Sequence, residues 1–297
     1  MPTLNFLGLD ETEILPEQAD VLIQPIPYDS TTSFQPGTRF GPEALLQARR
    51  QVELWDEGRH WEPFSRYRCL TLNEIPSNHR GPDFMAADIR AALKPYLQPR
   101  HIWAAIGGEH SISLPLVESL LEIHPGLVLC WLDAHGDLRD SWEGSRYSHA
   151  CVLRRIAELG VPIFHLGLRS LSREEQEFLE GRAGIRVYTS EEILLGQGLQ
   201  RFKGDLGTWT APDIYLSVDV DVFDPGLLPG TGTPEPGGLS WFSVLEAVRV
   251  ITDQGTVCGV DLCELMPLSA SRQSEFIAAK LLFKILSSVL YKKGAGR

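Results

Sequence analysis

Three side chains that can bind a metal ion follow one apolar run of the chain. Asp133, His135 and Asp137 stand at every second position after the run 127–132. If a β-strand continues through them, all three side chains point to one face of that strand. Holding them together beside an apolar wall is costly unless a cation is bound. The alternative is a loop start in which Asp and Gly serve a turn, and this motif alone does not decide between the two.

Acids and a histidine also end three further apolar runs, which cover residues 102–106, 214–218 and 257–262. The residues at these ends are His110, Asp219, Asp221 and Glu264. In a parallel sheet the carboxyl ends of the strands lie along one edge, where open α/β folds bind ligands. Each end taken alone is explained as a cap, a turn or a solvated acid, whereas the four together predict one site.

The residues collected at this edge favour a centre of two metal ions. They are His110, Asp133, His135, Asp137, Asp219 and Asp221. Four carboxylates in one closed site repel one another unless cations offset their charge. Nitrogen and oxygen donors without thiolate suit Mn²⁺, with Zn²⁺ or Co²⁺ as substitutes. A pair of such ions generates a hydroxide at neutral pH and clamps the reacting group.

Short apolar runs alternate with amphipathic stretches along the chain, which predicts an α/β fold with a mostly parallel sheet between two layers of helices. We expect strands at residues 21–23, 102–106, 127–132, 163–168, 186–188, 214–218 and 257–262. We expect helices after residue 42 and at 111–123, 148–159, 172–180, 240–252 and 274–290. No linker or repeat is found, so a single domain over residues 1–297 is predicted, with 224–238 as a loop that shapes the site.

The composition is that of a globular protein with a large core, since 43% of the 297 residues are hydrophobic and 22% charged. The 27 Lys and Arg residues against 39 Asp and Glu residues give a formal net charge of −12. This charge argues against binding to nucleic acids or anionic membranes. No apolar run reaches the roughly 20 residues of a membrane helix. Residues 1–10 lack a signal-peptide pattern and the five cysteines lack a Cys-x-x-Cys pair, so we expect a cytoplasmic protein.

Five motifs, in a fixed order over nearly the whole chain, carry a family resemblance. They lie at residues 37–43, 107–111, 133–137, 217–225 and 231–239. Together they resemble the ureohydrolase family, the arginase and agmatinase group. The resemblance implies the three-layer α/β/α arginase-like fold and a hydrolase that releases urea from a small cationic guanidino compound. It also implies two Mn²⁺ ions per chain and a homo-trimer or homo-hexamer.

The resemblance further implies a role for each site residue. One ion would be bound by His110, Asp133, Asp137 and Asp219, and the other by His135, Asp133, Asp219 and Asp221. Asp133 and Asp219 would bridge the ions, and a hydroxide between them would attack the guanidinium carbon.

Three side chains would complete the reaction by the same resemblance. Asp137 would hydrogen-bond the hydroxide, and Glu264 would pair with the guanidinium, a planar fork that suits a carboxylate. His149 would carry protons between bulk water and the site. A histidine at a helix start is otherwise usually structural, so the role of His149 rests on the family match. His165, in the middle of a predicted strand, is expected to belong to the core or to the surroundings of the ligands.

The segment 138–149 resembles the agmatinase branch of the family. It lacks the Asn- and Ser/Thr-rich stretch with which arginases bind the α-carboxylate and α-amino groups of their substrate. Agmatine, cleaved to putrescine and urea in polyamine biosynthesis, is therefore the expected substrate. Guanidinobutyrate, guanidinopropionate, guanidine, arginine and formiminoglutamate are the alternatives. No Asp occupies the family's Pro-x-x-Asp position after Pro267, which leaves substrate orientation and subunit contacts open.

Two hypotheses of other classes compete with a ureohydrolase. A two-metal hydrolase of phosphoesters is disfavoured by the scarcity of basic residues near the motifs, because phosphate usually requires Arg or Lys. A catalytically silent, metal-binding regulatory homologue would normally have lost a ligand or the proton shuttle, and every one of these residues is present in the sequence.

Overall fold

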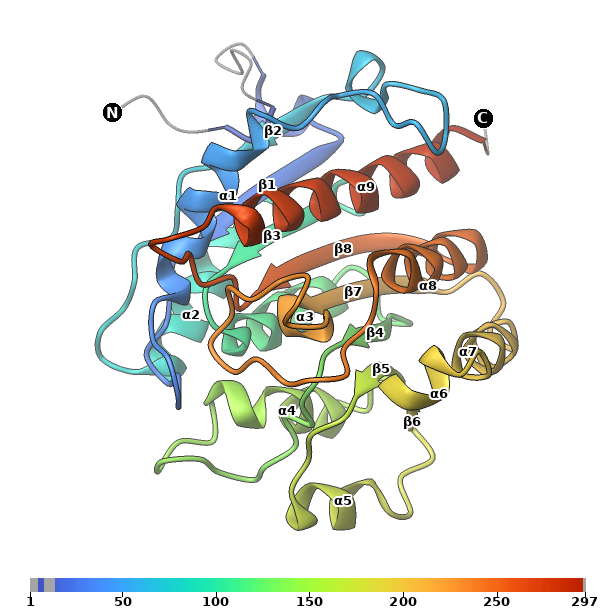
Figure 1. The fold of residues 1–297 in the computed structure, drawn as a ribbon. Coiled ribbons are helices and arrows are strands. Elements are labelled where there is room, and N and C mark those ends of the chain that lie inside the picture. The colour runs from blue at the N-terminus through green and yellow to red at the C-terminus, as the bar shows by residue number, and fades with distance from the viewer. Residues whose placement is uncertain (1–4, 8–13, 296–297) are drawn as a thin grey trace.

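A computed structural model describes residues 5–7 and 14–295, and one eight-stranded sheet forms the centre of this part of the chain (Figure 1). The strand order is β2-β1-β3-β8-β7-β4-β5-β6, and neighbouring strands pair in parallel. The strands are β1 (Val21–Ile26), β2 (Cys69–Thr71), β3 (Ile102–Gly107), β4 (Val128–Leu132), β5 (Ile163–Leu168), β6 (Ile185–Thr189), β7 (Asp213–Asp219) and β8 (Thr256–Cys263). The predicted α/β fold with a mostly parallel sheet is confirmed.

Helices cover both faces of the sheet, which gives the predicted three layers (Figure 1). One layer holds α1 (Gly41–Arg49), α6 (Ser190–Leu194), α7 (Gly198–Leu206), α8 (Trp241–Gln254) and α9 (Gln273–Ala295). The other holds α2 (Pro82–Leu93), α3 (Ser113–Leu121) and α4 (Val152–Glu158), with the short α5 (Arg173–Leu179) packed near its edge. Single 3₁₀ turns η1 to η7 lie at Pro16–Gln18, Thr38–Phe40, Pro63–Ser65, Lys94–Tyr96, His110–Ile112, His149–Cys151 and Val220–Val222.

Strand β4 shows why its sequence is apolar at every position. Val128, Cys130 and Leu132 face the core on one side of the sheet, and Leu129 and Trp131 face the core on the other. All five side chains are fully buried. A strand with helices on both faces has no solvent side, so the alternation of polar and apolar residues disappears.

The sequence left open whether a strand continues through residues 133–137, and the structure shows that it does not. Strand β4 ends at Leu132, where its pairing with β5 and β7 also ends. Beyond that point the Ala134 backbone N–H donates to a side chain, Oδ1 of Asp221, at 3.1 Å, while the Ala134 carbonyl oxygen still accepts the backbone N–H groups of Arg169 and Ser170. Asp137 has a φ of 52°, in the left-handed region. Asp221 likewise lies in η7 and not in the strand that ends at Asp219.

The other expected strands and helices are present, with bounds shifted by a few residues. The sequence interpretation missed β2, α2, α6 and α7. Strand β2 has three residues and helix α6 has five. Segments this short show no periodic pattern. The five cysteines are buried, as expected of core residues. Within residues 5–7 and 14–295 no helix is long and apolar enough to cross a bilayer. The expectation of no signal peptide concerns residues 1–10, of which 1–4 and 8–10 lie outside the described residues.

A buried ion pair attaches the turn at Asp56 to helix α9. Asp56 Oδ1 accepts a hydrogen bond from Nζ of Lys284 at 2.7 Å, and Oδ2 accepts one from the Ser287 hydroxyl. Replacing Asp56 by alanine is expected to lower the free energy of unfolding by about 3 kcal/mol, because the buried ammonium and hydroxyl lose their acceptor. Urea unfolding measures this loss. Glu57→Ala is the matched control, since Glu57 also contacts Lys284 but is 65% exposed, and an equal loss in both variants would contradict the prediction.

Candidate active site

The four central strands of the sheet carry the predicted site. In the order β3, β8, β7 and β4 they are neighbours, and their carboxyl ends lead into His110, Glu264, Asp219 and Asp133 respectively. The prediction that these four chain segments meet is therefore confirmed. Gly108 makes the turn after β3 possible, since a Cβ on it would lie 2.0 Å from the carbonyl oxygen of Tyr28. This turn brings His110 back over the end of the sheet.

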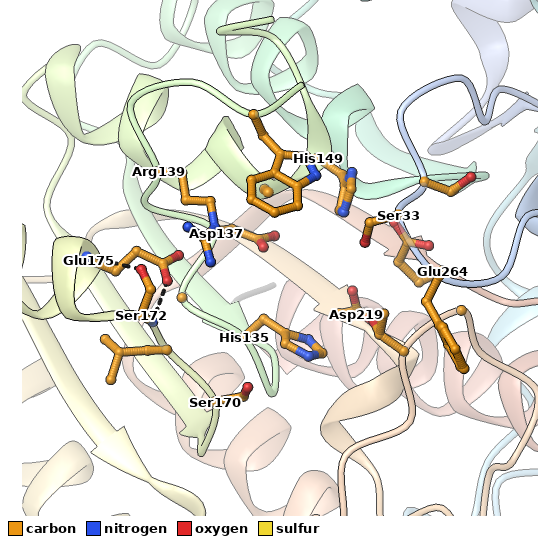
Figure 2. A pocket seen from close by; sticks show the side chains of 18 of the residues that line it. Ser33, His135, Asp137, Arg139, His149, Ser170, Ser172, Glu175, Asp219 and Glu264 are labelled. Atoms are coloured by element: carbon orange, nitrogen blue, oxygen red, sulfur yellow. Dashed lines mark hydrogen bonds between the residues drawn. The ribbon is translucent and has the colours of Figure 1, made fainter. Parts of the chain in front are cut away.

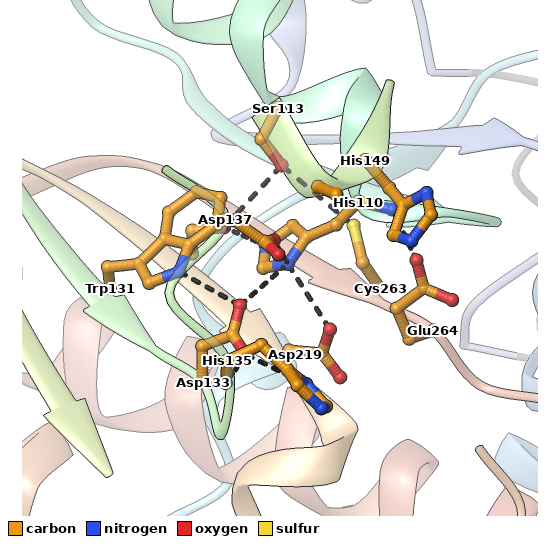
Figure 3. Close-up of polar contacts among 12 residues, drawn as sticks. His110, Ser113, Trp131, Asp133, His135, Asp137, His149, Asp219, Cys263 and Glu264 are labelled. Atoms are coloured by element: carbon orange, nitrogen blue, oxygen red, sulfur yellow. Dashed lines mark hydrogen bonds and ion pairs between the residues drawn. The ribbon is translucent and has the colours of Figure 1, made fainter. Parts of the chain in front are cut away.

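One group of ligands gathers around Nδ1 of His110 (Figure 3). This nitrogen lies 3.2 Å from Oδ2 of Asp133, 3.2 Å from Oδ2 of Asp219 and 3.7 Å from Oδ2 of Asp137. The imidazole is fully buried, and its Nδ1 has no hydrogen-bond partner. A buried, unpaired nitrogen facing three carboxylate oxygens is the arrangement that a cation would satisfy.

A second group gathers around His135. Its Nδ1 lies 2.8 Å from Oδ2 of Asp221 and 3.8 Å from Oδ1 of Asp133. Oδ2 of Asp221 is buried and accepts no hydrogen bond. Asp219 adjoins this group, because its Oδ1 accepts the backbone N–H of Asp221 at 2.8 Å. Asp133 therefore faces both groups, and Asp219 contacts a residue of each.

The donor set fits two divalent cations held by nitrogen and oxygen. Each group supplies an imidazole nitrogen and carboxylate oxygens, and each contains a buried polar atom left without a partner. Other buried polar atoms without a partner occur elsewhere in the described residues, but these two face the charged groups with which a cation would share them. The six predicted metal residues lie together in these two groups, and their assignment as ligands remains a prediction.

Charge crowding explains why the centre needs cations. Burial, together with the neighbouring charge of Asp133, raises the pKa of Asp137 well above its usual range. Burial and the charge of Asp221 do the same to Asp219. Burial alone would lower the pKa of both histidines, but the carboxylates raise it to about 9 for His110 and about 10 for His135. Without metal, the cluster therefore holds protons where cations would otherwise be bound.

Acidification is expected to weaken metal binding. Because the carboxylates raise the pKa values of His110 and His135, both rings carry a proton at neutral pH that the metal must displace. We expect the affinity for Mn²⁺ to fall by about tenfold per pH unit for each displaced proton. Titration calorimetry from pH 8 to pH 6 in buffers of different ionisation enthalpy measures the affinity and the released protons. An affinity independent of pH would contradict this prediction.

A carboxylate that the sequence interpretation missed supports His110 from the core. Ser217 lies between Asp261 and His110, with its Oγ 2.7 Å from Oδ1 of Asp261 and 2.8 Å from Nε2 of His110. The Tyr215 hydroxyl donates to the other oxygen of Asp261 at 2.7 Å. Since the single Ser217 proton goes to Asp261, Ser217 accepts from Nε2–H of His110. Nδ1 is then the nitrogen left for a metal ion once the extra proton of the ring is displaced, the pattern usual for metal-binding histidines.

Asp261 and Cys263 also approach His110 closely enough to suggest a third metal group. Both oxygens of Asp261 already accept hydroxyl hydrogen bonds. Burial, followed by the charge of Asp261, raises the pKa of the Cys263 thiol well above its usual range, so it stays protonated. Metal binding requires thiolate. This group therefore does not fit a metal ion.

A cavity of about 300 Å³ lies over the centre (Figure 2). Its lining includes His135, Asp137, Asp219, Glu264 and His149, so the predicted catalytic residues share one space with three of the predicted metal residues. Glu264 has a φ of 63°, and its Oε1 accepts the backbone N–H of His110 at 2.7 Å. Burial and then the charge of Glu109 raise the pKa of Glu264 to about 8. A cationic group in the cavity would stabilise the ionised form of Glu264 and lower its pKa again.

Glu175, which lines the cavity, is a second carboxylate that the sequence interpretation missed. Its carboxylate is buried and accepts the backbone N–H groups of Leu138 at 3.0 Å and Ser172 at 2.7 Å. Gly136 makes room for it, because a Cβ there would lie 2.9 Å from Oε1 of Glu175. Glu175 and Glu264 lie on opposite sides of the cavity in Figure 2. His165, as predicted, is a core residue, with its Nε2 3.4 Å from the carbonyl oxygen of Asp133.

Comparisons with known proteins agree with this geometry. Residues 19–287 match a family described as the arginase family. The chain is 35% identical over 283 residues to the N(1)-aminopropylagmatine ureohydrolase of Synechocystis sp., covering 93% of this chain and 92% of that protein. It is 36% identical over 279 residues to the agmatinase of Pyrococcus horikoshii, with 91% and 92% covered. The solved structure of the agmatine ureohydrolase of Thermoplasma volcanium superposes with a TM-score of 0.84 at 26% identity, covering 96% of this chain and 94% of that one.

Proposed function

This chain belongs to the arginase family, and from that premise we propose that it hydrolyses agmatine to urea and putrescine with two Mn²⁺ ions per chain. The observation that carries the proposal is the convergence of buried carboxylates on His110 and His135, in which Nδ1 of His110 and Oδ2 of Asp221 have no hydrogen-bond partner. These contacts support two cation positions near the cavity that His135, Asp137 and Asp219 line. The choice of Mn²⁺ rests on the oxygen-rich donor set.

The proposed ligand sets follow the two groups. His110, Asp133, Asp137 and Asp219 hold one ion, and His135, Asp133, Asp219 and Asp221 hold the other. When bound, the two ions would supply a hydroxide nucleophile at neutral pH and stabilise the charge that develops on the guanidino group.

Three side chains of the cavity act on the substrate and its protons in this proposal. Glu264 binds the guanidinium through its carboxylate and holds the central carbon over the centre. Asp137 accepts a hydrogen bond from the nucleophile and so fixes its direction of attack. His149 moves protons between the cavity and bulk water. Its ring lines the same cavity, and it hydrogen-bonds to Thr31 and Ser148, which are not proposed ligands.

A urea assay over a panel of guanidino compounds tests this function. The Mn²⁺-loaded protein is assayed with agmatine, guanidinobutyrate, guanidinopropionate, guanidine, arginine and formiminoglutamate, the last by its formamide product. We expect the highest kcat/KM with agmatine among these. Urea from none of the guanidino compounds, with two ions bound per chain, would favour the catalytically silent, metal-binding homologue instead.

A second substrate enters the panel because of the relatives. The Synechocystis protein is named for N(1)-aminopropylagmatine, which carries the same guanidinobutyl group as agmatine with a longer amine chain. Agmatine and N(1)-aminopropylagmatine are compared at equal concentration. A kcat/KM at least about tenfold higher for the longer amine, or about 1.4 kcal/mol of preference, would assign that substrate to this chain.

The remaining proposals concern the whole protein. We infer that residues 1–297 act as one domain, supported by the single sheet, and that the protein works in the cytoplasm as a homo-trimer or homo-hexamer, supported by family likeness. Light scattering on the purified protein measures the number of chains. The formal charge of −12 supports the absence of nucleic-acid partners.

A further inference from the structure

The hydroxyl of Thr31 lies between a buried carboxylate and the ring of His149. Thr31 Oγ1 is 2.8 Å from Oε1 of Glu109 and 3.1 Å from Nδ1 of His149. It also accepts the backbone N–H of His149 at 3.0 Å. Three chain segments meet here: the loop after β1, the turn after β3 and the start of η6. Thr31 therefore contacts the proposed proton shuttle at both its backbone and its ring.

Glu109 is surrounded by hydrogen-bond donors and is fully buried. Its Oε2 accepts the backbone N–H groups of Ser30 and Thr31, both at 2.6 Å. Its Oε1 accepts the hydroxyls of Thr31 and of Ser111, the latter at 2.6 Å. Burial raises the pKa of Glu109, and the hydrogen bonds from Ser111, Thr31 and Ser30 oppose this shift. All four hydrogen bonds have the carboxylate as acceptor, the geometry of an ionised group that accepts from Thr31.

The proton count of Thr31 then fixes the ring of His149. A hydroxyl has one proton, and Thr31 gives it to Glu109, so the oxygen can only accept from His149. The ring nitrogen at 3.1 Å must therefore be Nδ1–H, and Nε2 keeps its lone pair. The Ser148 hydroxyl lies 3.5 Å from the same nitrogen and can share that proton as a weaker acceptor. His149 and Glu264 both line the cavity.

We propose that Glu109 and Thr31 are positioning residues that hold His149 in the Nδ1–H tautomer, with the Nε2 lone pair presented to the cavity as the proton acceptor. This inference rests on the proposed shuttle role of His149. The same device serves His110 with the opposite nitrogen, because Asp261 and Ser217 hold its proton on Nε2 and free Nδ1. The Glu109–Thr31 pair thus leaves the lone pair of His149 on Nε2 for proton transfer. The Asp261–Ser217 pair leaves Nδ1 of His110 for the proposed metal ion.

Nitrogen-15 NMR of the metal-free protein, labelled at histidine, tests the tautomer directly. Assignment of the His149 signals is made by comparison with His149→Asn. We expect the signals of the native protein and of Thr31→Ser to report a proton on Nδ1, and those of the isosteric Thr31→Val to report a mixture or a proton on Nε2. A native His149 with its proton on Nε2 would overturn the proposal, whether or not any variant folds.

Kinetics of the Mn²⁺-loaded variants give the second readout. In Thr31→Val we expect kcat to fall by about 10- to 100-fold, the usual cost of losing a partner that orients a functional histidine. KM and the Mn²⁺ content should stay native, and Thr31→Ser should restore most of kcat. Native kcat in Thr31→Val would overturn the positioning role. Because the NMR readout needs no substrate, a failure of the proposed urea-forming activity is distinguishable from a failure of this inference.

Discussion

Replacing Asp133 by asparagine is expected to empty most of the metal centre and to lower turnover by about three orders of magnitude. Asp133 faces both ligand groups, since Oδ2 lies 3.2 Å from Nδ1 of His110 and Oδ1 lies 3.8 Å from Nδ1 of His135. One substitution therefore removes a carboxylate from both cation positions. The remaining ligands keep their places but share one negative charge fewer.

Asparagine is a poor replacement here for a second reason. Both oxygens of Asp133 accept hydrogen bonds, Oδ2 from the Trp131 indole at 2.9 Å and Oδ1 from the His135 backbone N–H at 2.6 Å. An amide NH₂ in either place would face another donor. Burial would raise the pKa of Asp133, but hydrogen bonding and the charge of His110 lower it to about 2. The native group is thus a carboxylate at every working pH.

Metal analysis decides this prediction. Native protein and Asp133→Asn are loaded with Mn²⁺, freed of unbound ions by gel filtration and analysed by mass spectrometry for ions per chain. Asp140→Asn is the matched control, because this acid follows in the same loop but its side chain is 51% exposed and pairs with Arg146 and Arg155. A native ion content in Asp133→Asn would contradict the ligand assignment, and an equal loss in the control would point to a folding defect.

The sequence predicted the place of the site because parallel strands carry their carboxyl ends to one edge. It did not predict that β3, β8, β7 and β4 are neighbours. Strand order depends on the packing of the long connections between parallel strands, which the sequence pattern does not describe. The side-chain alternation considered for residues 133–137 is not the geometry that brings these side chains together. Asp137 reaches the centre from a left-handed conformation, which no period of two describes.

The supporting residues were harder to predict, although one of them left a signal. Asp261 stands inside the apolar run 257–262, and a charged residue buried in a strand needs partners. Thr31 and Glu175 left no such signal in the sequence. Thr31 lies 78 residues before Glu109 in the chain, and the contact depends on how the loop after β1 crosses the sheet edge. Glu175 reads as a capping residue of α5, and its place beside Gly136 emerges only from the packed fold.

Replacing His149 by asparagine is expected to separate proton transfer from metal binding. Its ring hydrogen-bonds to Thr31 and Ser148 and to none of the proposed ligands, so two ions should remain bound. Burial, and then the positive charges of His110 and His135, lower the pKa of His149 to about 4. The ring is neutral at pH 7 and can accept a proton, which asparagine cannot do. We expect turnover to fall by about 10²- to 10³-fold.

The pH profile and chemical rescue distinguish this variant from Asp133→Asn. Burial is the main cause of the lowered pKa of His149 and remains when Mn²⁺ is bound, so we expect protonation of this ring not to limit the native rate between pH 6 and pH 8. Any acid loss of activity there comes from protons that displace the metal, and it should therefore have the same shape in native protein and His149→Asn. Imidazole added to the buffer should restore part of the rate of His149→Asn and none of the rate of Asp133→Asn. Equal loss of Mn²⁺ in both variants would instead make His149 part of the metal centre, since a residue that only moves protons has no reason to change the number of bound ions.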